Sequence, residues 1–321
     1  MIRLLFLFIL LYINILWSFS QVFTVDGRKL IDANGEEFLI RGVNNPHIWF
    51  PRHSYKSLET IAAFNANCIR IVWDAQGKPG KLKKIIRKCI ELELIPMVEL
   101  HDVTGKTTTD TLMRMVDYFK RSKVKDLLLR YEKYLLLNIA NEWGDHHTTS
   151  AYWRDTYAEA VDSLRKAGYT TTIVIDAPGW GQNLQPVLEY GNALLEHDPL
   201  HNLLFSIHMY GSWNNAEKIK NDLQKAYEAD LPLIVGEFGY NHNNGMNNLG
   251  CEVDQKVILE TCSQLQYGYI PWSWTGNNQE NAWLDMAEPK NWKVLTEWGE
   301  SVIDGEYGIR RTGEKASVFT D

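Results

Sequence analysis

Two glutamates stand at the ends of apolar segments, where a charged side chain needs a partner or a chemical purpose. Glu142 follows the run Leu135–Ala140, and Glu237 follows the run Leu233–Gly236. Two carboxyl groups at one site can serve as a proton donor and as a nucleophile or base, which is what hydrolysis of a glycosidic bond requires. The two glutamates are therefore the candidate catalytic pair.

Other polar and aromatic residues also collect at the ends of short apolar runs. They are Arg70, His101, Asn141, Asp176, His208, Tyr210, Trp272 and Trp274. The chain has 12 Trp, whose large flat rings suit either a core or a cleft that binds the faces of sugar rings. If the runs are neighbouring parallel strands, these side chains meet at one edge of the sheet.

Eight short apolar runs recur along the chain with centres about 33 residues apart, a spacing typical of βαβ units. The predicted strands are Phe38–Gly42, Cys68–Trp73, Ile95–Leu100, Leu135–Ala140, Thr172–Asp176, Leu204–Met209, Leu233–Gly236 and Tyr269–Trp274. Amphipathic segments between them include Gly80–Leu92, Thr109–Tyr118, Tyr152–Ala167 and Ala216–Ala229. Eight such units predict an α/β fold, the (β/α)8 TIM barrel. An open doubly wound sheet is the alternative, but no G-x-G-x-x-G follows the first strand.

The segment before the first strand, Phe23–Phe38, carries the turn signals Asp26-Gly27 and Asn34-Gly35. Alternating residues flank them, so we expect an N-terminal β-hairpin that closes the bottom of the barrel. No Pro/Gly/Ser-rich linker interrupts the chain. We therefore expect residues 21–321 to form a single catalytic domain.

The N-terminus resembles a secretory signal peptide. An apolar run from Leu4 to Trp17 follows Arg3, and Ser18 and Ser20 provide the small residues before a cleavage site. We expect residues 1–20 to be removed and the protein to be secreted. In an oxidising compartment the four cysteines are disulfide candidates. Of the three possible connectivities we favour the one that joins cysteines close in sequence, Cys68–Cys89 and Cys251–Cys262.

Charge and composition limit the range of partners. The formal net charge is −7, and 23% of residues are charged, with no basic block suited to nucleic acid. No segment after the signal peptide is long and apolar enough for a membrane span. No spacing of His or Cys is typical of a metal site. We expect a monomer without metal or cofactor.

Six motifs occur in the order found in a known enzyme family. They are Arg41-Gly-Val-Asn-Asn-Pro-His-Ile-Trp49, Glu99-Leu-His-Asp-Val-Thr-Gly105, Asn138-Ile-Ala-Asn-Glu-Trp143, Asp176-Ala-Pro-Gly-Trp-Gly-Gln182, Ser206-Ile-His-Met-Tyr210 and Trp272-Ser-Trp-Thr-Gly-Asn277. With Gly236-Glu237-Phe238-Gly239, they resemble glycoside hydrolase family 5 of clan A, and within it the bacterial-type endo-β-1,4-mannanases. The resemblance extends from about residue 23 to residue 310. One departure is Asn45, where that subfamily has His.

The resemblance implies a retaining mechanism with Glu142 as acid/base and Glu237 as nucleophile. Arg70 is then expected beside Glu237, where its charge favours the anion, and Tyr210 is expected to donate to the same carboxyl. Asn141 would bind the sugar 2-hydroxyl.

The remaining family positions would orient these groups or contact sugar. His101 and His208 are expected to orient Arg70, the glutamates or a hydroxyl. Trp274 is expected to form the floor beneath the sugar that is cleaved, with Trp272 as the less favoured choice. Trp49 and Trp180 are expected to be outer sugar platforms.

The resemblance implies a β-mannan polysaccharide substrate, and three alternatives remain. An endo-β-1,4-glucanase shares the same catalytic residues, so only the subfamily motifs and the shape of the cleft separate it from a mannanase. A non-catalytic polysaccharide-binding barrel would have lost a glutamate, and both are present. An exo-acting mannosidase would need a blocked cleft, for which the segment Asn241–Gly250 is the candidate, although its composition favours a flexible rim.

Overall fold

Eight parallel strands pair in chain order in the computed structural model, which describes residues 22–320. The strands are β3 (Gly42–Asn45), β4 (Cys68–Trp73), β5 (Ile95–Leu100), β6 (Leu136–Asn138), β7 (Ile173–Asp176), β8 (Leu203–Met209), β9 (Leu233–Phe238) and β10 (Gly268–Tyr269). A parallel bridge between Arg41 and Tyr269 joins the first strand to the last. The predicted (β/α)8 barrel is confirmed. The expected signal peptide, residues 1–20, lies outside the described residues.

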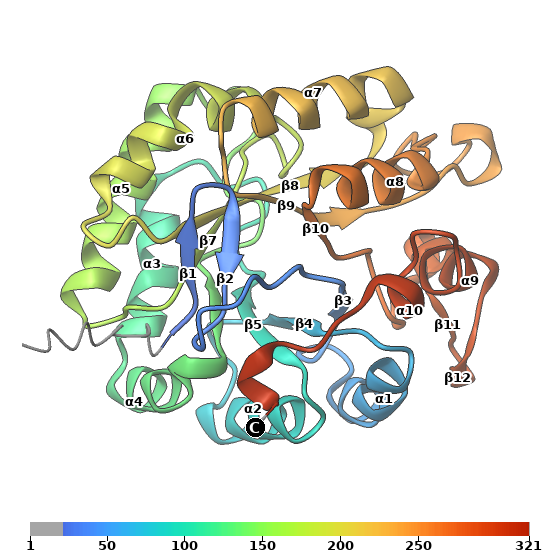
Figure 1. Cartoon of the computed structure of the whole chain (residues 1–321), viewed down its shortest axis with the longest axis horizontal. Coiled ribbons are helices and arrows are strands. Elements are labelled where there is room, and N and C mark those ends of the chain that lie inside the picture. Colours follow the sequence, from blue (N-terminus) through green and yellow to red (C-terminus); the bar gives the residue numbers. More distant parts are fainter. Residues whose placement is uncertain (1–21, 321) are drawn as a thin grey trace, which may run out of the picture.

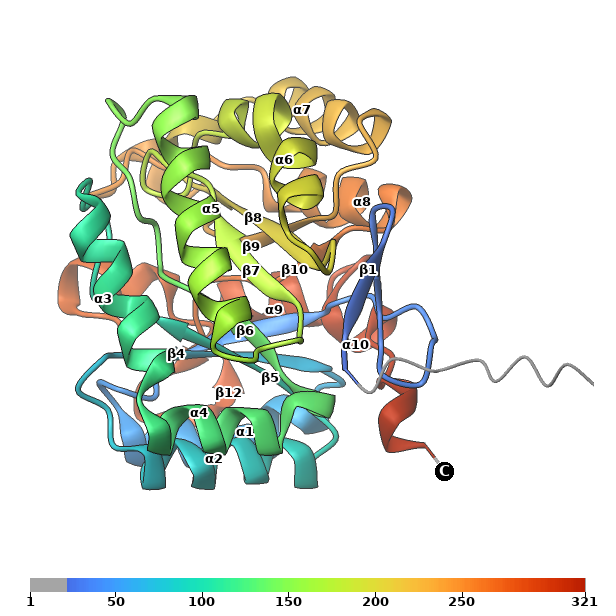
Figure 2. The same cartoon turned by 90° about the vertical axis from the view of Figure 1, so that its left-hand side faces the viewer.

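Helices surround the barrel (Figures 1 and 2). They are α1 (Pro51–Ala63), α2 (Pro79–Glu91), α3 (Thr109–Lys120), α4 (Ser122–Arg130), α5 (Ser150–Lys166), α6 (Gln185–His197), α7 (Ala216–Glu228), α8 (Gln255–Leu265), α9 (Glu297–Ile303) and α10 (Ile309–Thr312). The four helices predicted by periodicity occur within two residues of their predicted ends. No helix among the described residues is both long and apolar enough to cross a bilayer.

Local sequence explains why these helices begin where they do and which face they bury. In α5, Trp153, Tyr157, Ala160 and Leu164 recur every three or four residues, and all four are buried. This spacing places them on the helix face that packs against the strands. The side chain of Thr149 accepts a hydrogen bond from the first turn of the same helix, which satisfies a backbone donor that the helix leaves free.

The N-terminal hairpin closes the bottom of the barrel, as predicted. It consists of β1 (Thr24–Asp26) and β2 (Lys29–Ile31), which pair antiparallel and cross one end of the barrel in Figure 1. Phe23 and Leu30 from this segment pack in a buried cluster with residues at the starts of the barrel strands, including Ile95. The other ends of the strands, where the candidate site residues lie, are not covered by this hairpin.

The first and last barrel strands differ from their predicted ranges. The first was predicted over Phe38–Gly42, but β3 starts only at Gly42, because Phe38 and Ile40 join the bottom cluster instead. The last was predicted over Tyr269–Trp274, but β10 ends at Tyr269. Pro271 follows, and proline has no N–H to continue a ladder. A small hairpin of β11 (Ala287–Glu288) and β12 (Asn291–Leu295) then precedes α9.

The predicted disulfides, Cys68–Cys89 and Cys251–Cys262, are wrong: all four cysteines are buried free thiols. Cys68 packs in the bottom cluster, whereas Cys89 packs in the main core between strands and helices. Cys251 lies next to Gly239 at the upper end of β9. Cys262 is two turns into α8. Cys89 lies near enough to Cys68 to help raise the pKa of its thiol, but neither predicted pair is bonded.

The free thiols are expected to be unreactive in the folded protein, because burial raises the pKa of Cys251 to about 11 and that of Cys262 to about 12, and the thiolate is the reactive form. A chromogenic disulfide reagent should detect four thiols in denaturant and almost none in native buffer. Fewer than four thiols in the denatured, unreduced protein would contradict the free-thiol assignment.

Candidate active site

A fully buried guanidinium, that of Arg70 on β4, lies at the centre of the site. Its nitrogens donate to five side chains on the surrounding strands and strand ends. These are Asn44 (3.0 Å), Asn138 (2.9 Å), Asn141 (2.8 Å), Asp176 (3.3 Å) and Glu237 (2.7 Å). A buried cation with these partners keeps its charge, and the neighbouring carboxylates raise the pKa of Arg70 against the effect of burial. Arg70 therefore fixes the positions of several groups that the sequence placed at the site.

The Glu237 carboxyl, near the end of β9, is held from two sides. Arg70 donates to one oxygen at 2.7 Å, and the Tyr210 hydroxyl donates to the other at 2.9 Å. Burial raises the pKa of Glu237, the positive charges of His208 and Arg70 oppose that rise, and Glu142 adds to it, so the net direction is upward. Arg70 therefore lowers the pKa of Glu237, as expected, but burial raises that pKa by more.

The Glu142 backbone adopts a conformation that is uncommon for a residue other than glycine, with φ at 49°. Two hydrogen bonds hold it there. The Glu142 N–H donates to the Asp176 carboxylate at 3.1 Å, and the Glu142 carbonyl accepts from the Gly105 N–H at 2.9 Å. This turn directs the Glu142 side chain toward His208, whose Nδ1 lies 2.7 Å from one carboxyl oxygen.

One oxygen each of Glu142 and Glu237 and one nitrogen of His208 lie within 4.8 Å of one another. This is the only group of three or more potential metal-ligating side chains of this kind among the described residues. Arg70 and Tyr210 already bind the two Glu237 oxygens, and the guanidinium charge opposes a second cation there. The chemistry of these groups fits proton transfer and nucleophilic attack better than metal binding.

His208 lies between the two glutamates and above Asp176. Its Nδ1 is 3.6 Å from Glu237, and its Nε2 is 3.5 Å from Asp176. Burial lowers the pKa of His208, but Glu237, Asp176 and Glu142 together raise it to about 9. His208 therefore connects Glu142, through the 2.7 Å contact at Nδ1, to the negative charges of Glu237 and Asp176.

The Asn141 amide is oriented by its neighbours. Its oxygen accepts from Arg70 at 2.8 Å, so its NH₂ group must point the other way, toward Thr104 Oγ1 at 2.8 Å and His101 Nε2 at 3.5 Å. His101 is held in turn through Nδ1 by the buried Glu99 at 3.0 Å. Burial lowers the pKa of His101, and Glu99 outweighs that effect and raises it. Asn141 therefore presents a donor toward the cleft.

A cleft of about 570 Å³ opens above the glutamates. Its aromatic lining residues are Trp180, Tyr210 and Trp272. Trp272 stacks on the His101 ring, with centroids 5.5 Å apart. Trp180 is 38% exposed and packs edge-on against His146. Aromatic rings therefore line the same cleft as the two carboxyl groups.

The prediction that Trp274 forms the floor of the cleft is wrong. Trp274 is fully buried and packs against Phe64 below the cleft, whereas Trp272 lines the cleft. Trp272 and Trp274 are two residues apart and would face the same side of an extended strand, so their spacing does not distinguish them, and the barrel strand itself ends earlier, at Tyr269. Trp49 is half-exposed and contacts His101 edge-on at 5.0 Å, which places it at the rim. Asn45 is buried and donates to the Ser54 carbonyl.

The loop after β9, which was expected to be a flexible rim, is tied down by its own amides. The Asn247 side chain bonds the backbone of His242, Leu249 and Cys251. Asn248 bonds Asn281 across the gap to the loop after β10. Leu249 lines the cleft. The loop therefore forms a wall of the cleft.

Asp176 is a site residue whose importance the sequence did not reveal. It is fully buried at the end of β7 and contacts Arg70, Asn138, His208 and the backbone of Glu142. The sequence showed an aspartate at a strand end but not that it lies beneath the carboxyl pair. Asp176 is a positioning residue, since it acts through these neighbours.

Replacing Asp176 by Asn removes the charge and preserves the size of the side chain. We expect the pKa of His208 to fall from about 9, because Asp176 is one of the carboxylates that raise it. We expect kcat/KM on a glycoside substrate to fall by about ten- to a hundredfold, because Arg70 loses a carboxylate partner and Asn offers one acceptor oxygen in place of two. Imidazole titration by NMR and a pH–rate profile measure the two effects.

The same substitution at Asp198 is a matched control. Asp198 is also fully buried and pairs with Arg165 at 2.8 Å, outside the cleft. Asp198→Asn should lower stability without moving the pKa of His208. An unchanged His208 titration in Asp176→Asn would contradict the coupling described above.

Comparison with known proteins agrees with this geometry. Residues 31–278 match the family model described as cellulase, glycosyl hydrolase family 5. A mannan endo-1,4-beta-mannosidase from Salipaludibacillus agaradhaerens is 37% identical over 305 residues, covering 93% of this chain and 96% of that protein.

Solved structures show the same relationship. The β-mannanase from Thermomonospora fusca superposes with a TM-score of 0.85 at 36% identity, covering 93% of this chain and 99% of that one. Its mannohexaose complex superposes with a TM-score of 0.84 at 35% identity, with the same coverage. The family model spans most of this chain, and the barrel, its strand-end residues and these relatives agree: the chain belongs to glycosyl hydrolase family 5.

Proposed function

We propose that this protein is a secreted, monomeric endo-β-1,4-mannanase that hydrolyses internal bonds of β-mannans with retention of configuration. The observation that carries the proposal is the pair Glu142 and Glu237, whose oxygens lie within 4.8 Å of each other. Carboxyl groups of retaining enzymes are about 5–5.5 Å apart, whereas inverting enzymes need more room for a water molecule. Similarity to proteins named mannanases over nearly the whole chain supports mannan as the substrate.

In the first step, a Glu237 oxygen attacks the anomeric carbon, and the bond from that carbon to the leaving oxygen breaks. Glu142 gives its proton to the leaving oxygen, so the departing chain ends in a hydroxyl group. The product on the protein is a glycosyl ester of Glu237. The Tyr210 hydroxyl and Arg70 hold the attacking carboxylate in place, so its orientation is fixed before the substrate binds.

In the second step, Glu142 is a carboxylate and takes a proton from water, whose oxygen attacks the anomeric carbon. The ester bond breaks, Glu237 is regenerated as a carboxylate, and Glu142 is again protonated. Formation of the ester removes the negative charge of Glu237 next to Glu142, which allows Glu142 to act as acid in one step and as base in the next. Two inversions give net retention.

Recognition of mannose requires a donor near the axial 2-hydroxyl. The Asn141 NH₂ group faces the cleft because Arg70 binds the amide oxygen. Trp272, which lines the cleft, supplies an apolar surface for the sugar ring. The exposed rings of Trp49 and Trp180 offer contacts to sugars further along the chain, as internal cleavage of a polymer requires.

An endo-β-1,4-glucanase is the second candidate, because the catalytic residues are common to the family. The subfamily motifs and the named relatives favour mannan. A non-catalytic binding barrel is disfavoured, since the hydrogen bonds to Glu237 and Glu142 orient both carboxyl groups for reaction. Secretion is proposed from the apolar run Leu4–Trp17.

Proton NMR of the early reaction, together with rates on mannan and cellulose, tests this proposal. We expect the β-anomer to form first and mannan to be cleaved at least about ten times faster than cellulose, since an unpaired buried donor costs about 1–3 kcal/mol. The acidic limb of the pH–rate profile should lie above 4.5, the ordinary glutamate value, because the pKa of Glu237 is raised.

A Glu237→Gln variant with an unchanged circular dichroism spectrum is the control and should be inactive on mannan. An initial α-anomer would show inversion and refute the role of Glu237. Faster cleavage of cellulose than of mannan would instead assign the substrate to the second candidate and leave the mechanism in place.

A further inference from the structure

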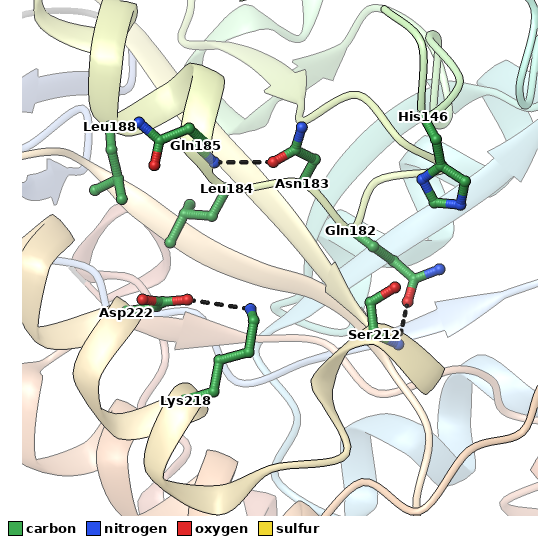
Figure 3. A pocket seen from close by; sticks show the side chains of 9 residues that line it. All are labelled: His146, Gln182, Asn183, Leu184, Gln185, Leu188, Ser212, Lys218 and Asp222. Carbon is green, nitrogen blue, oxygen red and sulfur yellow. Dashed lines mark hydrogen bonds and ion pairs between the residues drawn. The ribbon is translucent and has the colours of Figure 1, made fainter.

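A second recess of about 350 Å³ adjoins the cleft (Figure 3). It lies between the start of α6 and the start of α7, outside the carboxyl pair. Three of its lining residues, His146, Gln182 and Ser212, also line the main cleft. The Gln182 side-chain oxygen accepts the Ser212 N–H at 3.2 Å, so this contact forms the boundary between the two cavities. The recess and the cleft are therefore neighbours that share one wall.

The far wall of the recess carries a fixed pair of opposite charges. Lys218 and Asp222 on α7 lie 3.1 Å apart, as Figure 3 shows. The Lys218 ammonium also lies 3.2 Å above the centre of the Trp213 ring, and Lys225 makes a second ion pair with Asp222 at 2.8 Å. These contacts hold a charged donor and acceptor in place without a ligand.

The near wall adds an amide and an apolar surface. Gln185, the first residue of α6, is exposed, and its backbone is held by Asn183 at 3.2 Å. Leu188, one turn later, lines the same recess. Amide groups, a charged donor and acceptor, and a patch of aliphatic carbon are the contacts that a neutral sugar uses. The Asp222 carboxylate disfavours an anion, and the polar groups disfavour a purely apolar ligand.

The position of the recess assigns it to one side of the scissile bond. In the proposed mechanism Glu142 protonates the leaving oxygen, so the departing chain must lie on the Glu142 side. Loops after β6, β7 and β8 form that side and also supply the recess. Trp272 follows β10, which is two strands beyond β8 in the sheet. The recess therefore faces the leaving-group part of the substrate.

We propose that this recess binds one neutral hexopyranosyl unit of the departing chain, a claim that rests on the proposed function. The unit is either a further mannosyl residue of the main chain or a galactosyl branch, because both present the same kind of hydroxyl groups and apolar ring face. Occupation of the recess then adds affinity for long or branched substrates and none for short ones.

The test compares Gln185→Trp, which fills the recess with a bulky side chain, with the wild-type enzyme. Three substrates are used: mannotriose, linear mannohexaose and a galactosyl-substituted manno-oligosaccharide of the same main-chain length. We expect kcat/KM to fall by about tenfold on at least one longer substrate, the loss that corresponds to one or two hydrogen bonds, and to change by less than about twofold on mannotriose. Glu196→Trp, on an exposed position near the other end of α6, is the matched control and should leave all three rates unchanged.

The two longer substrates distinguish the sources of the bound sugar. A loss on the branched substrate alone identifies a galactosyl unit, and a loss on both identifies a main-chain mannosyl unit. Equal kcat/KM values for Gln185→Trp and wild type on both longer substrates overturn the recess proposal and leave the proposed function intact. A wild-type enzyme that cleaves none of the three substrates refutes the proposed function itself.

Discussion

The burial of one cation, Arg70, is the constraint on which the rest of the site depends. A guanidinium removed from water needs acceptors for its N–H groups and negative charge close by. The barrel supplies them from β3, β6, β7 and β9, through three asparagines, Asp176 and Glu237. The same contacts that stabilise the cation also position the Glu237 carboxyl, the proposed nucleophile, and orient the Asn141 amide. Burial of the Arg70 charge and placement of the site residues therefore require the same set of hydrogen bonds.

Glu142, the proposed acid/base residue, is connected to this network through Asp176. Asp176 accepts from Arg70 and from the Glu142 backbone, so the uncommon backbone conformation of Glu142 is compensated by a bond to a carboxylate that the cation also holds. His208 completes the connection, because it contacts Glu142 and lies close to both Glu237 and Asp176. Negative charge around it keeps its pKa high. Asp176 and His208 therefore connect the surroundings of Glu142 to those of Glu237.

The sequence predicted the barrel and most of the site because the information was local. Apolar runs mark buried strands, and the residue that follows each run lies at the same end of the barrel, as for Glu142. It could not predict features that depend on where the chain leaves a strand or on packing between distant segments. Strand β10 ends at Tyr269, and after it Trp272 lines the cleft whereas Trp274 is buried. Cys251 and Cys262 lie at different levels of the barrel, which their short separation conceals. The contacts of Asp176 exist only once strands β4 to β8 are side by side.

The central claim is that Arg70 and Tyr210 hold Glu237 as the nucleophile, and covalent trapping tests it most directly. A 2-deoxy-2-fluoro-β-mannobiosyl fluoride has a good leaving group, and its fluorine slows hydrolysis of the ester that forms. Mass spectrometry of the digested protein should find one added 2-fluoromannobiosyl group, on the peptide that contains Glu237. A label on Glu142, or turnover of the reagent with no covalent adduct at any time, would contradict the account.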